Sequence, residues 1–317
     1  MRMRIFFAVD AHGATKIWKK WIKIPEIYEV DVLMLCGDLT GKVLVPIVKQ
    51  KDNTYEVSYI GKKLKLSSKQ EVDAVREKLA EIGQYAIVCE ESMVESFKVS
   101  PELVEKIIEQ KIQERMEEWM EFLVTHVNIN KIKVIIMPGN DDVYSIDPII
   151  KSYSEKGIIW CLDNVVKIDS VEIIGLAHTN PTPWNTPREA TERELIRMIE
   201  SLANKLETPE KAIFNFHAPP YGTQLDLAPE LDRNKKPVIV GGQIRYIHVG
   251  SKAVRKAIEK YQPLLGLHGH IHESPGVAKI GKTVCINPGS EYSEGILHGY
   301  IIEIENGELQ NYWKVEG

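Results

Sequence analysis

Seven side chains of types that bind metal ions follow short apolar runs at widely separated points of the chain. They are Asp10, His12, Asp38, Asn140, His217, His270 and His272. Taken singly, each has an ordinary explanation, since Gly-Asp and Gly-Asn are common turns and a histidine after a strand is usually structural. In open α/β sheets, however, ligands gather at the carboxyl ends of strands, where residues distant in sequence converge. We therefore predict that the seven side chains form one metal site.

The chemical types of these seven side chains limit which metal ions they could bind. On an extended segment Asp10 and His12 would point the same way and could share an ion, and His270 and His272 repeat that spacing. Imidazole, carboxylate and amide oxygen together suit manganese, iron, zinc or a similar divalent ion, and the lack of thiolates argues against structural zinc. Seven ligands are too many for one ion. Two ions about 3.5–4 Å apart, sharing a carboxylate, would suit in-line displacement at phosphorus.

Short apolar runs bounded by polar clusters predict the strands that would position these residues. They cover residues 4–9, 31–35, 133–137, 173–176, 212–216 and 264–267. Helical patterns lie between several of them. Ser68 and Glu71 form a capping box before a helix that stops at Gly83, Ser100-Pro101 opens a longer helix, and a third is expected to start at 186–189. This alternation predicts an α/β fold.

Two regions depart from the simple alternation. Residues 277–315 predict antiparallel hairpins, one turning at Asn306-Gly307, so the sheet should be mixed. Residues 41–130 are far too long for a loop and contain a hairpin signal around Asp52-Asn53 before the first two helices. We predict a core of residues 1–40 and 131–317 with 41–130 as an insertion or cap. The alternative is that these helices are crossover helices of the core.

The composition is that of a globular protein. The chain has 317 residues, 44% of them hydrophobic and 27% charged, with a net charge of −5. This net negative charge argues against non-specific binding of nucleic acids. The four widely spaced cysteines are interpreted as buried thiols. No apolar run is long enough to be a signal peptide or to cross a membrane, so we expect a cytoplasmic protein; the oligomeric state stays open.

Five motifs occur in a fixed order along the chain. They are Asp10-Ala11-His12, Gly37-Asp38, Gly139-Asn140, an isolated His217, and Gly269-His270-Ile271-His272. As an ordered set they resemble the calcineurin-like metallophosphoesterases, over residues 5 to about 290 outside the insertion. The stretches HAPPYGTQLD, HVGS, GHIHES and INPGSEYSEG resemble more closely the Icc-related predicted phosphoesterases. This closer resemblance names a subgroup and no substrate.

The resemblance implies a fold, an activity and a ligand set. The fold would be an αββα sandwich of mixed sheets, and the activity that of a dinuclear metal-dependent phosphodiesterase or phosphatase. Asp10, His12, Asp38 and His272 would hold one ion, with Asp38 bridging to a second held by Asn140, His217 and His270. A hydroxide between the ions would be the nucleophile. The substrate would be a small or medium phosphomonoester or phosphodiester, nucleotide-like compounds included.

The chain departs from the family pattern at two places. The family commonly has Gly-Asn-His followed by Asp or Glu, where the histidine assists the leaving group or the substrate phosphate; here Asp141 and Asp142 follow Asn140. The segment from His268 to His272 also offers two His-X-His registers. We choose the second, because Gly269 then occupies the family position, and expect a structural role for His268.

Residues near these motifs are candidates for substrate binding and proton transfer. Asn180, Trp184 and Arg188 lie in a proline-rich loop, where Arg188 could clamp a phosphate and Trp184 could stack a base. Alternatively, Trp184 packs the loop and Arg188 makes an ion pair. Ser251 starts a predicted helix, a site suited to phosphate. His248 is proposed as the missing proton donor, with Asp141 as the competing donor; a purely structural role is the alternative for His248.

Two other functions remain open at this stage. A nuclease of the same fold would need a basic groove beside the metals, against which the acidic balance speaks. A non-catalytic interaction module would be expected to have lost ligands, yet all seven are present.

Overall fold

The computed structural model describes residues 2–317 and contains two six-stranded sheets with helices around them. The first sheet consists of β1 (Arg2–Val9), β2 (Val32–Cys36), β7 (Lys133–Met137), β8 (Ile158–Trp160), β19 (His298–Glu305) and β20 (Glu308–Glu316). The second consists of β9 (Val165–Ile168), β10 (Val171–Leu176), β11 (Ile213–Phe216), β16 (Leu265–Leu267), β17 (Gly276–Ile280) and β18 (Thr283–Asn287). The surrounding helices are α1 (Thr15–Ile22), α2 (Ile24–Tyr28), α5 (Pro101–His126), α6 (Ile146–Ser152), α7 (Glu192–Ala203) and α8 (Lys252–Tyr261).

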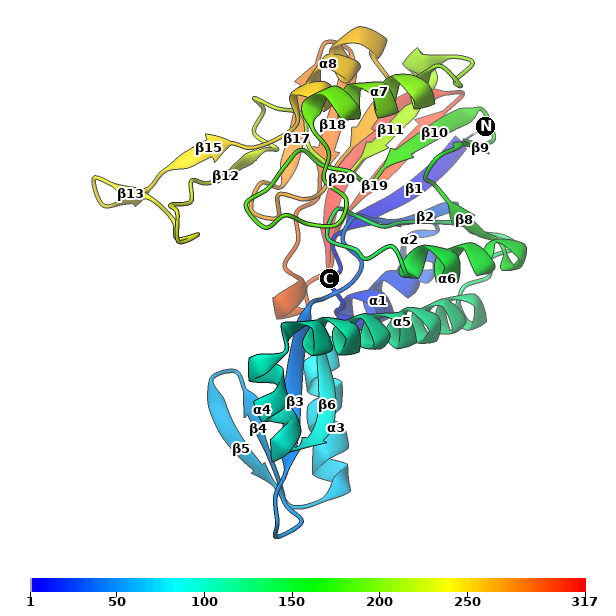
Figure 1. Ribbon diagram of the computed structural model, residues 1–317. Helices are drawn as coiled ribbons and strands as arrows, with labels where there is room; N and C mark the ends of the chain where they lie inside the picture. Colours follow the sequence, from blue (N-terminus) through cyan, green and yellow to red (C-terminus); the bar gives the residue numbers. More distant parts are fainter. Residues whose placement is uncertain (1) are drawn as a thin grey trace.

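The two sheets are mixed and pack face to face. Their strand orders are β20-β19-β1-β2-β7-β8 and β17-β18-β16-β11-β10-β9. The neighbours β1, β2, β7 and β8 are parallel, as are β10, β11, β16 and β18, while the remaining edge strands pair antiparallel. Figure 1 shows α7 and α8 over one sheet and α1, α2, α5 and α6 over the other. The predicted αββα sandwich of mixed sheets is therefore confirmed.

The burial of both faces of each sheet explains why its strands read as continuous apolar runs. In β1, Ile5 and Phe7 pack into the cluster between the sheets, whereas Phe6 and Ala8 pack against the helices on the other side. A third apolar cluster lies between the second sheet and helices α7 and α8. The predicted hairpin with its turn at Asn306-Gly307 is present as β19 and β20.

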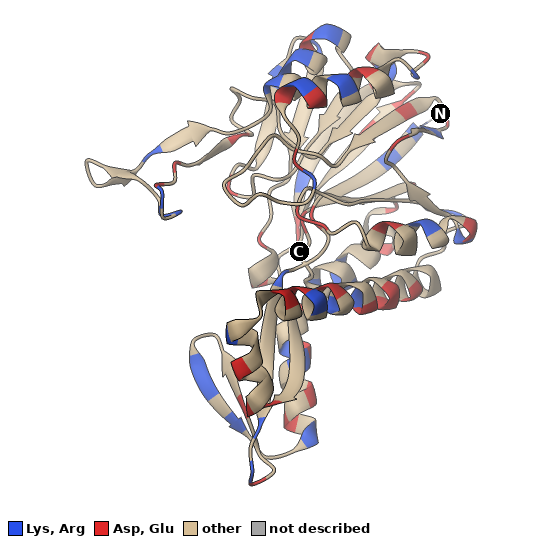
Figure 2. Ribbon diagram, viewed as in Figure 1, with Lys and Arg blue, Asp and Glu red and all other residues tan. Residues whose placement is uncertain are grey.

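The segment between β2 and β7 forms a small sheet of its own before it returns to the core. It contains β3 (Val43–Lys49), β4 (Tyr55–Tyr59), β5 (Lys62–Leu66), α3 (Lys69–Glu81), β6 (Gln84–Glu90) and α4 (Glu91–Val99), with strand order β5-β4-β3-β6. Figure 1 shows this unit projecting from the sandwich, and Figure 2 shows the basic residues along β5. The capped helix after Ser68 is observed, because the Ser68 hydroxyl accepts a hydrogen bond from the Glu71 N–H. A second turn at Ile60-Gly61, strand β6 and helix α4 were not anticipated.

Helix α5 joins this projecting unit to the main core. Its second half is buried against the first sheet, and the ring of Trp119 lies 4.3 Å from that of Trp18. Arg115 donates to the carbonyl groups of Gly13 (3.0 Å) and Gln84 (2.9 Å), which links the loop after β1 to the start of β6. The small sheet with α3 has its own apolar cluster, whereas α5 packs as a core helix. Within residues 41–130, the small sheet with α3 fits the predicted insertion, whereas α5 fits the alternative of a core helix. The division of the chain into domains stays a prediction.

A second projection leaves the sandwich between β11 and α8. It is a narrow ribbon of β12 (Leu227–Pro229), β13 (Ile239–Val240), β14 (Gln243–Ile244) and β15 (Tyr246–His248), which we call the arm, and Figure 1 shows it extending away from the body.

The predicted third helix begins later than expected, because Thr191 and Glu194 form the capping box of α7. Among the described residues, no helix is long and apolar enough to span a membrane.

The packing of α5 predicts different costs for the same substitution at its two ends. Leu123 is fully buried in the main core, whereas Leu103 is half-buried near the start of the helix. Leu123→Ala should lower the free energy of unfolding by about 2–5 kcal/mol, because the cavity adds to the lost burial. Leu103→Ala is the matched control and should cost clearly less. Equal costs in urea denaturation would show that α5 is not anchored by its second half.

Candidate metal centre

The predicted ligands lie on loops that leave the carboxyl ends of parallel strands in both sheets. Asp10 follows β1, Asp38 follows β2 and Asn140 follows β7 in the first sheet. In the second sheet, His217 follows β11, and the segment with His270 and His272 follows β16. The face-to-face packing of the sheets brings these loops together. Convergence at the strand ends, which the sequence suggested, is what the structure shows.

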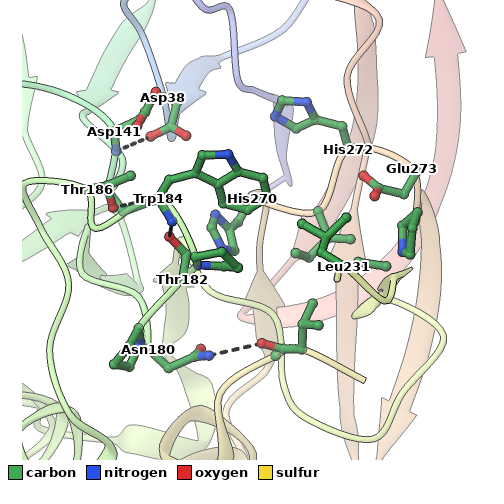
Figure 3. Close-up of a pocket in the computed structure, with 18 of the residues that line it drawn as sticks. Asp38, Asp141, Asn180, Thr182, Trp184, Thr186, Leu231, His270, His272 and Glu273 are labelled. Atoms are coloured by element: carbon green, nitrogen blue, oxygen red, sulfur yellow. Dashed lines mark hydrogen bonds between the residues drawn. The ribbon is translucent and has the colours of Figure 1, made fainter. Parts of the chain in front are cut away.

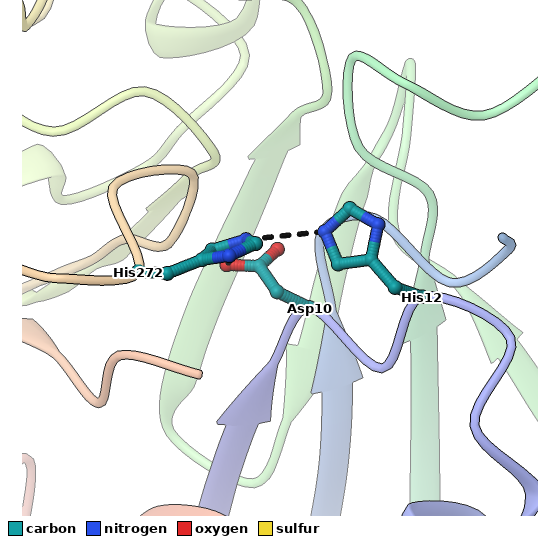
Figure 4. A group of neighbouring side chains, drawn as sticks. All are labelled: Asp10, His12 and His272. Carbon is teal, nitrogen blue, oxygen red and sulfur yellow. Dashed lines mark hydrogen bonds and ion pairs between the residues drawn. The ribbon is translucent and has the colours of Figure 1, made fainter. Parts of the chain in front are cut away.

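Two groups of side chains lie close enough to hold metal ions. Asp10, His12 and His272 form one group, and Asp38, His217 and His270 form the other; the ligand atoms of each group lie within 4.8 Å of one another. In the first group the Nε2 atoms of His12 and His272 approach to 3.1 Å, and Figure 4 shows both rings beside the Asp10 carboxylate.

The two groups adjoin, and a third group overlaps them. His12 Nε2 lies 3.8 Å from Asp38 Oδ2, and His217 Nδ1 lies 3.8 Å from Asp10 Oδ1. His12, Asp38 and Asp141 form the third group within the same 4.8 Å limit. Asp38 and His12 each take part in two of the three groups, and the Asp38 carboxylate lies between His12 and His217, whose Nε2 atom is 3.5 Å from Asp38 Oδ1.

The backbone at three ligands differs from the sequence expectation. Asp10, His12 and His270 have φ values of 55°, 41° and 68°, which are left-handed rather than extended. The assumption that Asp10 and His12, or His270 and His272, align by alternating along a strand is therefore wrong. Tight turns aim these side chains at the centre instead. Such conformations cost on the order of 1–3 kcal/mol each and are concentrated at functional sites.

The glycines of the motifs have a steric reason. A Cβ atom on Gly37 would collide with Asp10 Oδ1 and with the ring of His217, and Gly37 also has a φ of 91°. A Cβ on Gly139 would collide with Asp38 Oδ1 and with the Asp38 backbone nitrogen. Only glycine at these two positions lets the loops approach the carboxylates this closely.

Hydrogen bonds fix the two central carboxylates. Asp10 Oδ1 accepts from the Asp38 N–H at 3.0 Å, and Asp10 Oδ2 accepts from the His270 N–H at 2.9 Å. Asp38 Oδ1 accepts from the Asp141 N–H at 2.8 Å. Behind them, the Ser290 hydroxyl donates to the Asp10 carbonyl at 2.7 Å. Each loop thus orients a carboxylate that belongs to another loop.

Asp142 braces the loops from the buried side. Its carboxylate accepts hydrogen bonds from the N–H groups of Leu39, Thr40 and Gly139, each at 2.9 Å, and from the Thr40 hydroxyl at 2.6 Å. Burial and the nearby Asp38 charge raise the pKa of Asp142 to about 7. The sequence showed two consecutive acids after Asn140, but it did not show that the second is fully buried and holds the Gly-Asp loop against the Gly-Asn loop.

The atoms that face the centre have the properties of metal ligands. Both ring nitrogens of His217 and the Oδ1 atom of Asn140 are buried without a hydrogen-bond partner. Burial lowers the pKa of His12 and of His270 to about 3, so both imidazoles are neutral and free to coordinate. Burial also lowers the pKa of His217, but the charges of Asp38 and Asp10 outweigh it and raise that pKa to about 9. Imidazole nitrogen with carboxylate and amide oxygen fits divalent manganese, iron or zinc.

A pocket of about 1110 Å³ opens over the candidate ligands. His12, Asp38, Asn140, His270 and His272 line it, as does Asp141. Figure 3 shows His270 and His272 with Trp184, Thr182 and Leu231, which contribute to the wall.

Two of the four predicted substrate residues line this pocket. Trp184 is 59% exposed, and Asn180 donates from Nδ2 to the Val249 carbonyl at 3.0 Å. His248 and Asp141, the predicted proton donors, line it too.

The structure does not bring Arg188 and Ser251 to the pocket. Arg188 is buried, and its guanidinium pairs with Asp147 at 2.6 Å and donates to backbone carbonyls of the loop after Asn140. Ser251 is buried as the N-cap of α8, donating to Glu192 and accepting from the Val254 N–H. Both side chains have their hydrogen bonds satisfied within the protein, so a substrate role for them has no geometric support.

The pocket also contains residues that sequence reasoning missed or assigned elsewhere. Lys42, at the start of the projecting segment, pairs with the Asp141 carboxylate beside the ligands. The only signal for Lys42 was its place four residues after Asp38. His268 is fully buried, and its Nδ1 atom lies 2.8 Å from the Phe216 carbonyl oxygen, which agrees with the expected structural role.

Comparison with known protein sequences finds a relative of about half of the chain. No protein-family model matches the chain. The uncharacterized protein MJ1162 of Methanocaldococcus jannaschii is 34% identical over 159 residues, which cover 49% of this chain and 63% of that protein, less than two thirds of its length.

Solved structures extend the likeness to the whole chain. One crystal structure has a TM-score of 0.58 at 14% identity and covers 100% of this chain and 99% of its own. The crystal structure of TT1561 of Thermus thermophilus has a TM-score of 0.54 at 13% identity, with the same coverage. These likenesses show the fold alone, a sandwich of two mixed sheets, over the whole length of the chain.

The Asp142 brace leads to a prediction about the assembly of the centre. Asp142→Ala should lower the free energy of unfolding by at least about 2 kcal/mol, because buried N–H groups that lose their acceptor cost about 1–3 kcal/mol each. It should also weaken metal binding, since the loops that carry Asp38 and Asn140 lose their common anchor. Thermal denaturation and metal titration would measure both effects. Asp73→Ala, at an exposed site on α3, is the control. Unchanged stability in Asp142→Ala would refute the bracing role.

Proposed function

We propose that the chain is a metal-dependent phosphoester hydrolase with a dinuclear centre. The observation that carries the proposal is the pair of adjoining ligand groups under an open pocket, with Asp38 of the second group 3.8 Å from His12 of the first. A single ion would leave several of the seven buried or half-buried ligands without a partner. The ordered family motifs and the shared sandwich fold support the same class.

The residues divide naturally between two ions. Asp10, His12 and His272 would hold one, and His217 and His270 the other, with Asp38 shared. We add Asn140 to the second ion, because its Oδ1 atom is buried without a hydrogen-bond partner. Bound divalent ions would supply an activated water nucleophile and would offset the negative charge of the phosphoryl group. Asp141 is adjacent to both His12 and Asp38 and is a further candidate ligand.

The chain's own residues would bind and orient the substrate. The Lys42 ammonium group is held next to the ligand groups by Asp141, and its side chain is 44% exposed toward the pocket. It is therefore placed to donate hydrogen bonds to a phosphoryl oxygen. Trp184, Tyr221 and Leu231 give the wall an apolar part that could contact the remainder of an ester.

The size of the pocket favours a substrate larger than inorganic phosphate. At about 1110 Å³ it is as large as sites that enclose whole small molecules. We therefore propose a small or medium phosphomonoester or phosphodiester as the substrate. Loading the metal-free protein with Mn²⁺, Fe²⁺ or Zn²⁺ and screening it against both ester classes tests the activity. A protein that binds two ions but cleaves none of these esters would refute it.

The shared position of Asp38 predicts that a neutral replacement should disrupt both ion sites. Asp38→Asn should reduce bound metal below two ions per chain and remove phosphoester hydrolysis, because the charge between the two ligand groups is lost. Elemental analysis of the loaded protein, together with hydrolysis of bis(p-nitrophenyl) phosphate, measures this. Asp73→Asn on the exposed face of α3 should change neither quantity. Two ions and full activity in Asp38→Asn would exclude a bridging role.

Lys42 should act on phosphate affinity rather than on metal content. Lys42→Met removes a charged hydrogen-bond donor worth about 1.5–3 kcal/mol, so inorganic phosphate should bind roughly 10- to 100-fold more weakly. Competitive inhibition by phosphate and calorimetric titration both measure this affinity. Lys62→Met, in the exposed strand β5 of the same segment, is the matched control. If both variants bind phosphate like the parent protein, Lys42 is only an ion-pair partner of Asp141.

A further inference from the structure

A buried carboxylate at the base of the arm holds one histidine of the pocket wall. Asp226 is fully buried, and its Oδ2 atom accepts from the N–H groups of Gly222 and Gly250, both at 3.0 Å. Its Oδ1 atom accepts from the Thr223 N–H at 2.9 Å and lies 2.8 Å from His248 Nδ1. Asp226 thus connects the chain before the arm with the chain after it, and His248 is the last residue of β15.

These contacts determine the orientation and the tautomer of the imidazole. Three backbone N–H groups can only donate, so they suit an anionic acceptor at Asp226. The short contact to His248 must then be a hydrogen bond from Nδ1–H to the carboxylate. Nε2 is left as the ring nitrogen that can exchange a proton with another group. The second nitrogen is thus available while the first is fixed.

The position of His248 differs from that of the histidines in the ligand groups. It lines the same pocket, but it belongs to none of the three candidate metal groups. Its side chain is 40% exposed, so Nε2 is accessible to a bound molecule and to solvent. The Tyr221 ring packs beside it in an edge-to-face arrangement, with the two ring centroids 5.8 Å apart. The protein therefore orients the His248 imidazole, and this ring is not one of the candidate metal ligands.

The competing donor is engaged elsewhere. Asp141 pairs with Lys42, and its N–H donates to Asp38, so it is fixed within the ligand cluster. A carboxyl group beside bound cations would be ionised and have no proton to give. His248 has neither restriction.

We infer that His248 is the general acid of the reaction and that Asp226 is its positioning residue. This inference rests on the proposed phosphoester hydrolysis. As water adds its oxygen to phosphorus, the P–O bond to the leaving group breaks and its electron pair stays on the leaving oxygen. That oxygen takes the proton from Nε2 of the His248 imidazolium. The water releases its own proton to solvent, and the neutral imidazole regains one from solvent, so the cycle balances.

A series of leaving groups tests the assignment. General acid catalysis typically contributes 10²- to 10⁴-fold, so His248→Gln should slow the hydrolysis of alkyl phosphoesters by at least about 10²-fold. The same variant should hardly change the hydrolysis of p-nitrophenyl esters, because p-nitrophenolate leaves without a proton. Metal content by elemental analysis should be unchanged. Asp226→Asn should show the same selectivity in weaker form if it folds, since it keeps an acceptor but loses the charge.

His126→Gln is the matched control for these variants. His126 is exposed at the end of α5, where its ring is hydrogen-bonded to the Phe122 carbonyl oxygen. Its replacement should change the rate of hydrolysis of neither class of ester. If His248→Gln slows alkyl and p-nitrophenyl esters equally, or slows neither, the general-acid assignment is overturned while the hydrolase function stands. If the metal-loaded parent protein cleaves no ester in the series, the proposed function itself fails.

A spectroscopic measurement gives an answer that does not depend on turnover. In ¹⁵N-labelled protein, the His248 ring should show protonated Nδ1, and its Nε2 resonance should move when inorganic phosphate is titrated into the metal-loaded protein. Asp226→Asn should alter the Nδ1 resonance without unfolding the chain, as judged by the remaining amide spectrum. An Nε2 resonance that does not respond to phosphate would show that His248 does not reach the reacting group, and would overturn the inference.

Discussion

The close approach of the carboxylates of Asp10 and Asp38 is the constraint on which the rest of the site depends. Both are almost fully buried at adjoining strand ends, where like charges repel and water is largely excluded. Backbone N–H groups stabilise them, yet these bonds do not neutralise the cluster. An arrangement of this kind is stable when cations occupy it, and the unpartnered nitrogens of His217 mark where a cation would bind.

That constraint explains features of the fold that otherwise look unrelated. The loops must approach within van der Waals contact of the carboxylates, which only Gly37 and Gly139 allow. They must also stay in place against charge repulsion, and the buried Asp142 carboxylate ties them together through backbone hydrogen bonds. Each ligand group takes residues from both sheets, so the apolar cluster between the sheets holds the members of each group together.

The sequence predicted the parts of this structure that depend on local pattern. Buried parallel strands read as apolar runs, and the ligand types that follow them converge because strand ends do. What it could not show were relationships that exist only after folding. Asp10 and His12 were expected to align along a strand, but left-handed turns orient them. Arg188 looked like a phosphate clamp, but it is held by Asp147 and by two backbone carbonyls, all more than 40 residues away in the sequence. Lys42 was counted with the insertion, although its ammonium group lies at the centre.

The two projections from the sandwich share one feature: each places a residue, Lys42 or His248, in the pocket wall. Lys42 begins the segment that forms the small sheet, and His248 ends the arm, so each residue lies where a projection joins the body. Both contribute a nitrogen to the pocket, and both are held by an aspartate, Asp141 or Asp226. The candidate metal ligands come from turns next to the strands, which leaves them little freedom to vary. The groups proposed to contact phosphate and leaving group come from the bases of the projections instead, so we expect changes there to alter substrate selection while the geometry of the candidate metal ligands is retained.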